Sequence, residues 1–213
     1  MMLRLVDEAV EDYCLNHSTP ETNIYEELRE ETYQSMELPQ MLAGQLVGSF
    51  LQMMIRSLNA KRIVEVGTFT GYSTLKMAEV LGTGGRIDTF EYEDAHADFA
   101  ERYFKKAPWG AKITLHRGAA LDHLPRLQGP IDLSFIDADK VNYVNYYNHL
   151  VELTRPGGLV ILDNALWSGK VLNPVEESDH ALNEMNQVVH ADKRVTALLL
   201  PIRDGLMVAQ KNA

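Results

Sequence analysis

Two apolar runs in this chain end in side chains that carry oxygen donors. The runs close with FIDADK and LVILDN, so Asp137, Asp163 and Asn164 follow what read as two buried strands. Open α/β sheets place their ligands at the carboxyl ends of such strands, so we expect these three side chains to lie together. Oxygen donors favour a hard cation such as Mg²⁺ over zinc. With the amine of Lys140 nearby, the pattern predicts a metal site rather than an ordinary surface.

The elements that would position this site follow from the rhythm of the chain after residue 59. Alternating strands and helices predict a doubly wound α/β fold with a mostly parallel sheet. An ArgAspGly turn separates the last two strands, and so close a connection requires them to be antiparallel. A seven-stranded sheet with an antiparallel last strand is typical of class I methyltransferases, a Rossmann-like variant, rather than of dehydrogenases. The expected strands span 62–67, 86–91, 112–117, 131–137, 158–163, 195–202 and 206–211, and the expected helices 72–82, 94–107, 120–127, 141–154 and about 178–191.

Length and composition fit a single domain. The chain has 213 residues, of which 46% are hydrophobic, enough to bury a sizeable core. We expect one domain over 1–213, in which residues 1–58 form N-terminal helices and 59–213 the Rossmann-like core. The expected N-terminal helices span 3–15, 24–36 and 40–58.

Charge and cysteine content narrow the class of partner and the compartment. The formal net charge is −10, which argues against binding to a nucleic-acid backbone. The N-terminal segment carries charges every few residues and lacks the apolar stretch of a signal peptide or membrane span. Cys14 is the single cysteine, as expected in a reducing compartment. We therefore expect a cytoplasmic protein with no nucleic-acid and no membrane partner.

The first turn between a strand and a helix, EVGTFTGYS, has the composition of a ligand-binding turn. Gly67 and Gly71 allow the backbone to turn sharply, while Thr68 and Ser73 offer hydroxyl and N–H groups at a helix N-terminus. The dinucleotide fingerprint GxGxxG is absent. Glu65 would repel a pyrophosphate but attract an ammonium group, which favours a cationic ligand such as S-adenosylmethionine. The alternative is a tight turn that needs small residues without any ligand.

The next two strand ends supply further candidates for the same ligand. Glu91 ends the second strand about twenty residues past the glycine turn, where a carboxylate can accept both ribose hydroxyls. Tyr92 follows it directly. After the third strand, Ala119 belongs to a run of small residues that suits the edge of an adenine ring, although a simple tight turn explains that run equally well.

Several motifs together carry a resemblance to a known family. EVGTFTGYS, FIDADKVNY, GGLVILDNALWSGKV and LLPIRDGL, in this order and spacing, resemble the cation-dependent O-methyltransferases typified by caffeoyl-CoA O-methyltransferase and its bacterial relatives, with catechol O-methyltransferase as a more distant relative. The similarity spans about residue 33 to the C-terminus. It implies transfer of a methyl group from S-adenosylmethionine to a vicinal-diol aromatic small molecule, of catechol or hydroxycinnamoyl type, by a homodimer.

The resemblance also assigns roles to positions of this chain. It implies that Asp137, Asp163 and Asn164 hold Mg²⁺, or Mn²⁺ or Ca²⁺ in its place. Lys140, beside Asp137, would be the general base that takes the proton of the acceptor hydroxyl. The implied cofactor positions are Met41, Ala43, Glu65, Gly67, Thr68, Ser73, Glu91, Tyr92, Ala119, Asp137 and Asp139.

Two residues are candidates for contact with the acceptor, and the function itself has alternatives. Trp167 follows the second oxygen pair and could cover an aromatic ring. Arg203 could meet an acidic group, although a solvated turn is the default interpretation. A catalytically idle cofactor-binding protein remains an alternative, whereas a nicotinamide-dependent oxidoreductase fits less well because the glycines do not suit phosphates. The first forty residues contain no clear basic contact for coenzyme A, so a thioester acceptor is left open.

Overall fold

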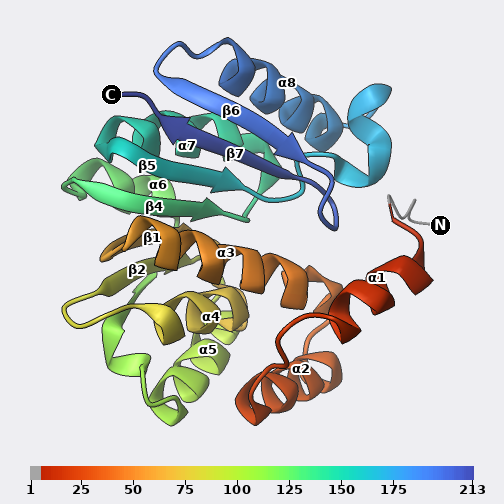
Figure 1. Ribbon diagram of the computed structural model, residues 1–213, viewed down its shortest axis with the longest axis vertical. Helices are drawn as coiled ribbons and strands as arrows, with labels where there is room; N and C mark the ends of the chain where they lie inside the picture. Colours follow the sequence, from red (N-terminus) through yellow and green to blue (C-terminus); the bar gives the residue numbers. More distant parts are fainter. Residues whose placement is uncertain (1–5) are drawn as a thin grey trace.

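The computed structural model describes residues 6–213, which form a seven-stranded sheet flanked by helices (Figure 1). The strand order is β3-β2-β1-β4-β5-β7-β6. Strands β1 to β5 pair in parallel, whereas β7 is antiparallel to both of its neighbours, β5 and β6. The predicted sheet, with its antiparallel last strand, is thereby confirmed. The strands are β1 Arg62–Val66, β2 Arg86–Glu91, β3 Ile113–Arg117, β4 Ile131–Ile136, β5 Thr154–Leu162, β6 Val195–Leu200 and β7 Leu206–Lys211.

The helices cover the sheet in two layers because their apolar side chains pack against it. Helices α3 and α4 share one buried cluster with the sheet, and α7 and α8 share another. Helix α2 packs on α4 and α5 through Tyr25 and Leu28. The α-helices are α1 Glu8–Asn16, α2 Asn23–Ser35, α3 Gly44–Leu58, α4 Tyr72–Val80, α5 Asp94–Lys106, α6 Ala120–His123, α7 Tyr143–Leu153 and α8 Glu177–Ala191, and the 3-10 helices are η1 Pro39–Met41, η2 Gly110–Lys112, η3 Leu124–Arg126, η4 Lys140–Asn142 and η5 Trp167–Leu172.

Most predicted elements agree with the structure to within two residues at each end, and three differ by more. The helix expected at 40–58 begins at Gly44, because the segment before it folds as η1 and Gly44 adopts a φ of +81°. The helix expected at 120–127 is the short α6 followed by η3, which contains a proline in its first turn. Strand β5 begins four residues earlier than expected, because α7 ends at Leu153 and the chain pairs at once with β4. Residues 3–5 of the first expected helix lie outside the described residues.

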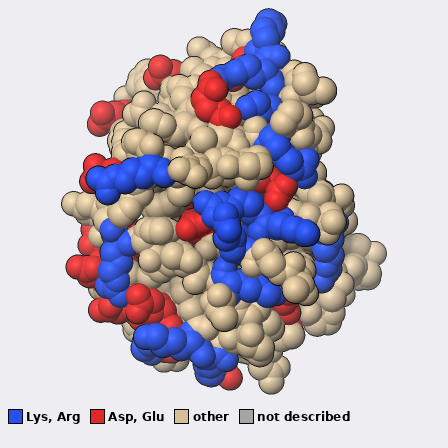
Figure 2. Space-filling view, turned by 90° about the vertical axis from the view of Figure 1, so that its left-hand side faces the viewer, with Lys and Arg blue, Asp and Glu red and all other residues tan. Residues whose placement is uncertain are grey.

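Ion pairs of basic side chains connect the starts of the parallel strands. Figure 2 shows Lys and Arg side chains gathered in the middle of the side where these strands begin. Arg62 and Arg155, at the starts of β1 and β5, pair with Asp88 and Asp132 at 3.0 and 2.5 Å. Asp132 also accepts the backbone N–H groups of Lys61 and Arg62, both at 2.8 Å. These pairs connect the strand starts, at the end of the sheet opposite the predicted site.

Between residues 6 and 213, no helix is long and apolar enough to cross a bilayer.

Candidate active site

The carboxyl ends of β1, β4 and β5 meet where the strand order reverses, the point at which doubly wound sheets bind ligands. The backbone N–H of Asp137 donates to Val66 O, and that of Asp163 donates to Ile136 O, both at 2.9 Å. Gly67 allows the chain after β1 to pass close by, since an added Cβ would lie 1.9 Å from the carbonyl oxygen of Asp137. Asp137, Asp163 and the turn of residues 67–71, called the glycine turn below, therefore lie together at the carboxyl ends of the central strands.

Asp163 is a buried carboxylate whose hydrogen bonds are incomplete. Its side chain is fully buried, Oδ1 accepts the backbone N–H of Asn164 at 2.7 Å, and Oδ2 accepts no hydrogen bond from any residue between 6 and 213. Burial raises the pKa of Asp163 to about 7, and the nearby carboxylate of Asp137 adds to the shift. Asn164 adopts a left-handed φ of +58°, which asparagine tolerates better than most residues. An unpartnered buried carboxylate oxygen calls for a cation or a proton.

Lys140 lies between two of the three proposed metal ligands. Its Nζ donates to Asp137 Oδ1 at 3.1 Å, to Asn164 Oδ1 at 2.7 Å and to Tyr143 Oη at 2.7 Å. The acidic partner of Lys140 is therefore Asp137 and not Asp139, its neighbour in the chain. The ammonium group is thus hydrogen-bonded to oxygen atoms that would coordinate a metal ion.

The donor set fits a hard divalent cation. Two carboxylates and one amide oxygen come from adjacent strand ends, and one carboxylate oxygen is orphaned. Among residues 6–213 no group of three or more His, Cys, Asp or Glu side chains could hold a metal ion. The set of Asp137, Asp163 and Asn164 contains only two side chains of these types, because its third donor is an amide. Its all-oxygen chemistry is that of Mg²⁺, Mn²⁺ or Ca²⁺ sites.

Glu65 is fully buried beneath the glycine turn and does not face solvent. Its carboxylate accepts hydroxyl hydrogen bonds from Ser73 at 2.6 Å, from Thr89 at 2.6 Å and from Thr74. Burial raises the pKa of Glu65 to about 7, although these hydroxyls offset part of the shift. Thr68 is also buried, with Oγ1 2.6 Å from that of Thr89. These side chains therefore shape the turn from below, and their polar atoms face one another.

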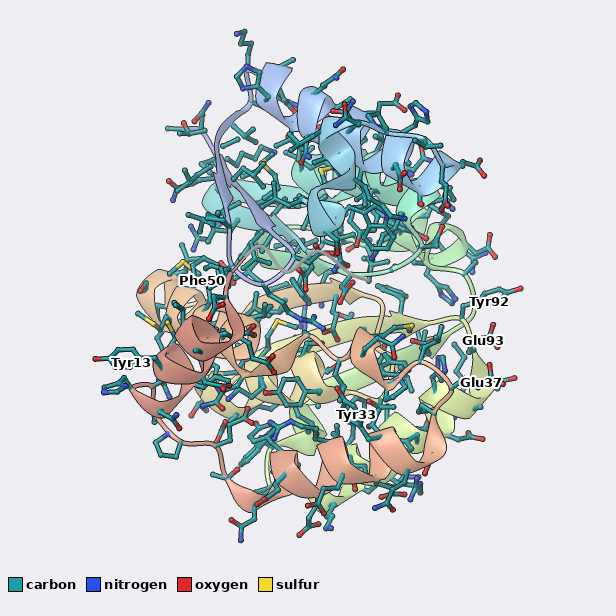
Figure 3. The ribbon with its side chains drawn as sticks, turned by 90° about the vertical axis from the view of Figure 1, so that its right-hand side faces the viewer. Tyr13, Tyr33, Glu37, Phe50, Tyr92 and Glu93 are labelled. Carbon is teal, nitrogen blue, oxygen red and sulfur yellow. The ribbon has the colours of Figure 1, made fainter. Side chains whose placement is uncertain are left out.

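The end of β2 is tied to the glycine turn. Glu91 Oε2 accepts the backbone N–H of Phe69 at 2.7 Å, and Oε1 accepts that of Glu93 at 3.0 Å. Tyr92 is 72% exposed. Figure 3, which looks onto the side of the carboxyl ends, places Tyr92 and Glu93 along one border of this face. Ala119 caps α6 next to Gly118, whose N–H donates to Glu91 O at 2.8 Å, so the predicted ribose and adenine positions adjoin.

The remaining predicted cofactor positions fall into two groups. Met41 ends η1 and is exposed, whereas Ala43 is buried in the cluster that α3 shares with the sheet. Asp139 is exposed and accepts hydrogen bonds from Tyr146 Oη and from Asn142 Nδ2. The structure thus brings Asp139 to the rim, within two residues of Asp137, while Met41 arrives from the N-terminal segment.

The loop that carries Trp167 has an unusual backbone. Trp167 and Ser168 adopt left-handed φ angles of +46° and +52°, a costly conformation for such residues. The turn between β6 and β7 stabilises it: Asp204 Oδ1 accepts the N–H of Ser168, and Asp204 O accepts that of Leu166 at 2.9 Å. The ring of Trp167 lies 5.6 Å from Lys140 Nζ, so the indole adjoins the proposed metal ligands.

Arg203 has a different setting from the one expected. Its guanidinium donates to the carbonyl oxygen of Gln40 at 2.7 Å and lies 4.0 Å from Asp163 Oδ2. Arg203 thus links the last hairpin to η1, the segment that carries Met41, rather than standing free in a solvated turn.

Sequence reasoning missed two residues of this site. Tyr143 is fully buried and receives a hydrogen bond from Lys140, and Asp204 holds the loop of Trp167. The spacing of Tyr143, three residues after Lys140, was the available signal, because a helical turn brings such residues onto one face. Asp204 lies in the LLPIRDGL motif, but no pattern in the sequence linked it to Ser168, which lies 36 residues away in the chain.

Comparisons with known proteins place this geometry in a family. A family model described as O-methyltransferase matches residues 15–212. A catechol O-methyltransferase of Niastella koreensis is 37% identical over 76% of this chain and 78% of its own length. Caffeoyl-CoA O-methyltransferase 1 of Eucalyptus globulus is 36% identical over 77% of this chain and 72% of its own. The crystal structure of the O-methyltransferase from Bacillus cereus in complex with SAH has a TM-score of 0.88 and 30% identity, covering 96% and 97% of the two chains.

The sheet topology and the glycine turn define a class I methyltransferase, the same architecture as the solved neighbours. The chain belongs to the O-methyltransferase family, and it is an S-adenosylmethionine-dependent O-methyltransferase of the caffeoyl-CoA and catechol type.

Proposed function

We propose that this O-methyltransferase depends on a divalent metal ion and methylates one hydroxyl of a vicinal-diol aromatic small molecule, of catechol or hydroxycinnamoyl type. The observation that carries the proposal is Oδ2 of Asp163, which is buried at the same strand ends as Asp137 and Asn164 and, among the described residues, accepts no hydrogen bond. Its nearest cation is the Arg203 guanidinium, at 4.0 Å. Bound to these three side chains, Mg²⁺, or Mn²⁺ or Ca²⁺, would supply the positive charge that acidifies and fixes two adjacent hydroxyls.

Lys140 is the proposed general base. With Asp137 and Asn164 engaged as ligands of a cation, Lys140 would lose two of its three hydrogen-bond acceptors. After release of one proton to solvent, its neutral amine would have a lone pair for the proton of the acceptor hydroxyl. Tyr143, the third acceptor, keeps the amine at the floor of the site. Transfer of the proton to Lys140 leaves an oxygen nucleophile that attacks the sulfonium methyl group in line, so holding the two centres in line and excluding water provide most of the acceleration.

The proposed cofactor positions follow three strands, and each group of residues is assigned to a different part of S-adenosylmethionine. We assign the ribose hydroxyls to Glu91, the adenine edge to Tyr92 and Ala119, and the methionine portion to the glycine turn with Met41 and Ala43. Glu65 acts on that portion through Ser73, to which it is hydrogen-bonded, and not by direct exposure. Asp139 contributes at the rim.

The acceptor ring is assigned to Trp167. Its indole lies close to Lys140, which places an aromatic surface at the proposed site of methyl transfer. Its neighbour Asp204 keeps the loop in its left-handed conformation, so the indole is held rather than free.

An acceptor panel tests the proposal. The protein is incubated with S-adenosylmethionine, Mg²⁺ and matched pairs of aromatic compounds that carry either two adjacent hydroxyls or one, and products are identified by mass spectrometry. We expect singly methylated product from the vicinal diols only. Asp163→Asn should abolish it, whereas Asp132→Asn, at the opposite edge of the sheet, should retain it. Equal methylation of monohydroxy compounds would refute the vicinal-diol acceptor.

We further propose that the enzyme is a cytoplasmic homodimer. Size-exclusion chromatography with light scattering should then give a mass near twice the 24.0 kDa of the chain. A mass near 24.0 kDa at all concentrations would contradict the dimer.

A further inference from the structure

Helix α2 contacts the glycine turn through a buried pair of hydroxyl groups. Thr32 of α2 and Thr70 of the turn are both fully buried, and their Oγ1 atoms are 3.1 Å apart. Thr32 Oγ1 also donates to Leu28 O at 2.8 Å. A hydroxyl has one proton and a carbonyl can only accept, so the proton of Thr70 is available for the contact between the two threonines. Within residues 6–213, Thr70 Oγ1 has no other hydrogen-bond partner.

Thr70 lies in the part of the turn where the backbone is least free. Its neighbours Phe69 and Gly71 adopt left-handed φ angles of +49° and +88°. On one side the N–H of Phe69 is held by Glu91, the proposed ribose ligand, at 2.7 Å. From outside the sheet, the turn is held by Thr32. A change at Thr32 therefore acts on the cofactor through the turn and not by contact.

A second contact joins the same N-terminal segment to the helix that follows the turn. Glu21 accepts hydrogen bonds from Tyr72 Oη and Arg29, and its carboxylate lies 3.2 Å from Lys76 Nζ. Lys76 is 5% exposed, so this ion pair lies largely out of contact with solvent. Tyr72 is the first residue of α4 and precedes Ser73, which is hydrogen-bonded to Glu65.

Helix α2 has anchors that do not involve the turn. Glu31 accepts a hydrogen bond from Tyr103 Oη at 2.6 Å and pairs with Arg102 at 2.8 Å, both on α5. Tyr25 Oη donates to Glu79 Oε2 at 2.9 Å. In Figure 3 the helix that carries Tyr33 crosses the lower part of the face on which the strands end. Removal of the Thr32 hydroxyl should thus leave α2 in place and affect the turn alone.

We propose that α2 and the segment directly before it form a functional wall of the cofactor site, in which Thr32 of α2 positions the glycine turn and Glu21 of the preceding segment positions the first turn of α4, so that both set the affinity for S-adenosylmethionine. Thr32 and Glu21 are positioning residues, since they are argued to act through Thr70 and Tyr72, to which they are hydrogen-bonded. The inference rests on the assignment of the glycine turn to the cofactor.

The test uses Thr32→Val, which leaves Thr70 buried without a partner. We expect the dissociation constant for S-adenosylmethionine, measured by calorimetry, to rise about tenfold, because an unsatisfied buried hydroxyl is costly. Thr154 provides a matched control: it is also buried, and its Oγ1 donates to Leu150 O at 2.7 Å, but it begins β5 at the opposite edge of the sheet. Thr154→Val should lower the melting temperature comparably and leave the affinity unchanged.

Two further variants separate positioning from general destabilisation. Thr32→Ser keeps the hydroxyl and should bind the cofactor as the parent does. The double variant Thr32→Val with Thr70→Val should bind no worse than the weaker single variant, because both remove one shared contact. Parental affinity in Thr32→Val, or an equal loss in Thr154→Val, would overturn the inference. A parent protein that does not bind S-adenosylmethionine would instead refute the assignment of the turn.

Discussion

Replacing Lys140 by methionine should improve metal binding while it impairs catalysis. In the structure the ammonium donates to Asp137 Oδ1 and Asn164 Oδ1, so it competes with a divalent ion for two of its three proposed ligands. A hydrogen bond to a charged group contributes about 1.5 to 3 kcal/mol, and release of one such bond corresponds to binding of Mn²⁺ about 10 to 100 times tighter. Methionine preserves the length of the side chain and removes the charge. Loss of the general base should slow methyl transfer by about 10² to 10⁴.

Titration calorimetry with Mn²⁺ measures the first effect and product formation the second. Lys170→Met is the matched control, because Lys170 pairs with Glu176 and Asp179 at 3.8 and 3.7 Å and touches none of the proposed ligands. It should change metal affinity little. If Lys140→Met binds Mn²⁺ no more tightly than the parent, the ammonium does not occupy the metal position and the assignment of this site is wrong.

Three other predictions follow from single contacts. The pKa of Glu65 is raised by burial from 4.5 to about 7, so its contribution to stability is full below pH 4.5 and is lost as the pH rises through 7. Glu65→Gln should therefore remove a decrease of about 2 to 3 kcal/mol in the free energy of unfolding between pH 5 and pH 8, and the same pH dependence of this free energy in parent and variant would contradict the prediction. Gly67→Ala should destabilise the protein by at least about 2 kcal/mol more than Gly84→Ala, because both glycines have positive φ but only at Gly67 would a Cβ meet the backbone of Asp137; equal losses in urea denaturation would refute the close approach. Arg203→Met should weaken binding of S-adenosylmethionine, because it removes the hydrogen bond that holds η1, and should leave the ratio of KM values for acidic and neutral acceptors unchanged. A rise in KM for acidic acceptors alone would show instead that Arg203 contacts the acceptor.

The parts of the fold that sequence could predict are those with a strong period or a strict geometric rule. The segments before Asp137 and Asp163, IDLSFI and LVIL, consist mainly of apolar residues, so both were recognisable as buried strands whose ends must meet. The closeness of the last two strands required an antiparallel pair. By contrast, the start of α3 was predicted wrongly, since helical periodicity continued through a segment that Pro39 and the positive φ of Gly44 fold differently.

The predicted site residues divide along similar lines. Motif positions at strand ends, such as Glu91, were placed by topology alone. The setting of Glu65 was not, because its three hydroxyl partners come from two separate elements and turn its carboxylate inward. The contact of Arg203 with Gln40 spans 163 residues and has no local signature. Long-range polar contacts of this kind become visible only in the folded chain.

The most direct test of the account is methyl transfer from S-adenosylmethionine to a vicinal-diol acceptor after removal of divalent metal with a chelator and after Mg²⁺ is restored. The account predicts that product disappears on chelation, returns with Mg²⁺ in the parent, and does not return in Asp163→Asn. Undiminished product after chelation, or full activity of Asp163→Asn, would contradict the metal site on which the proposed function rests.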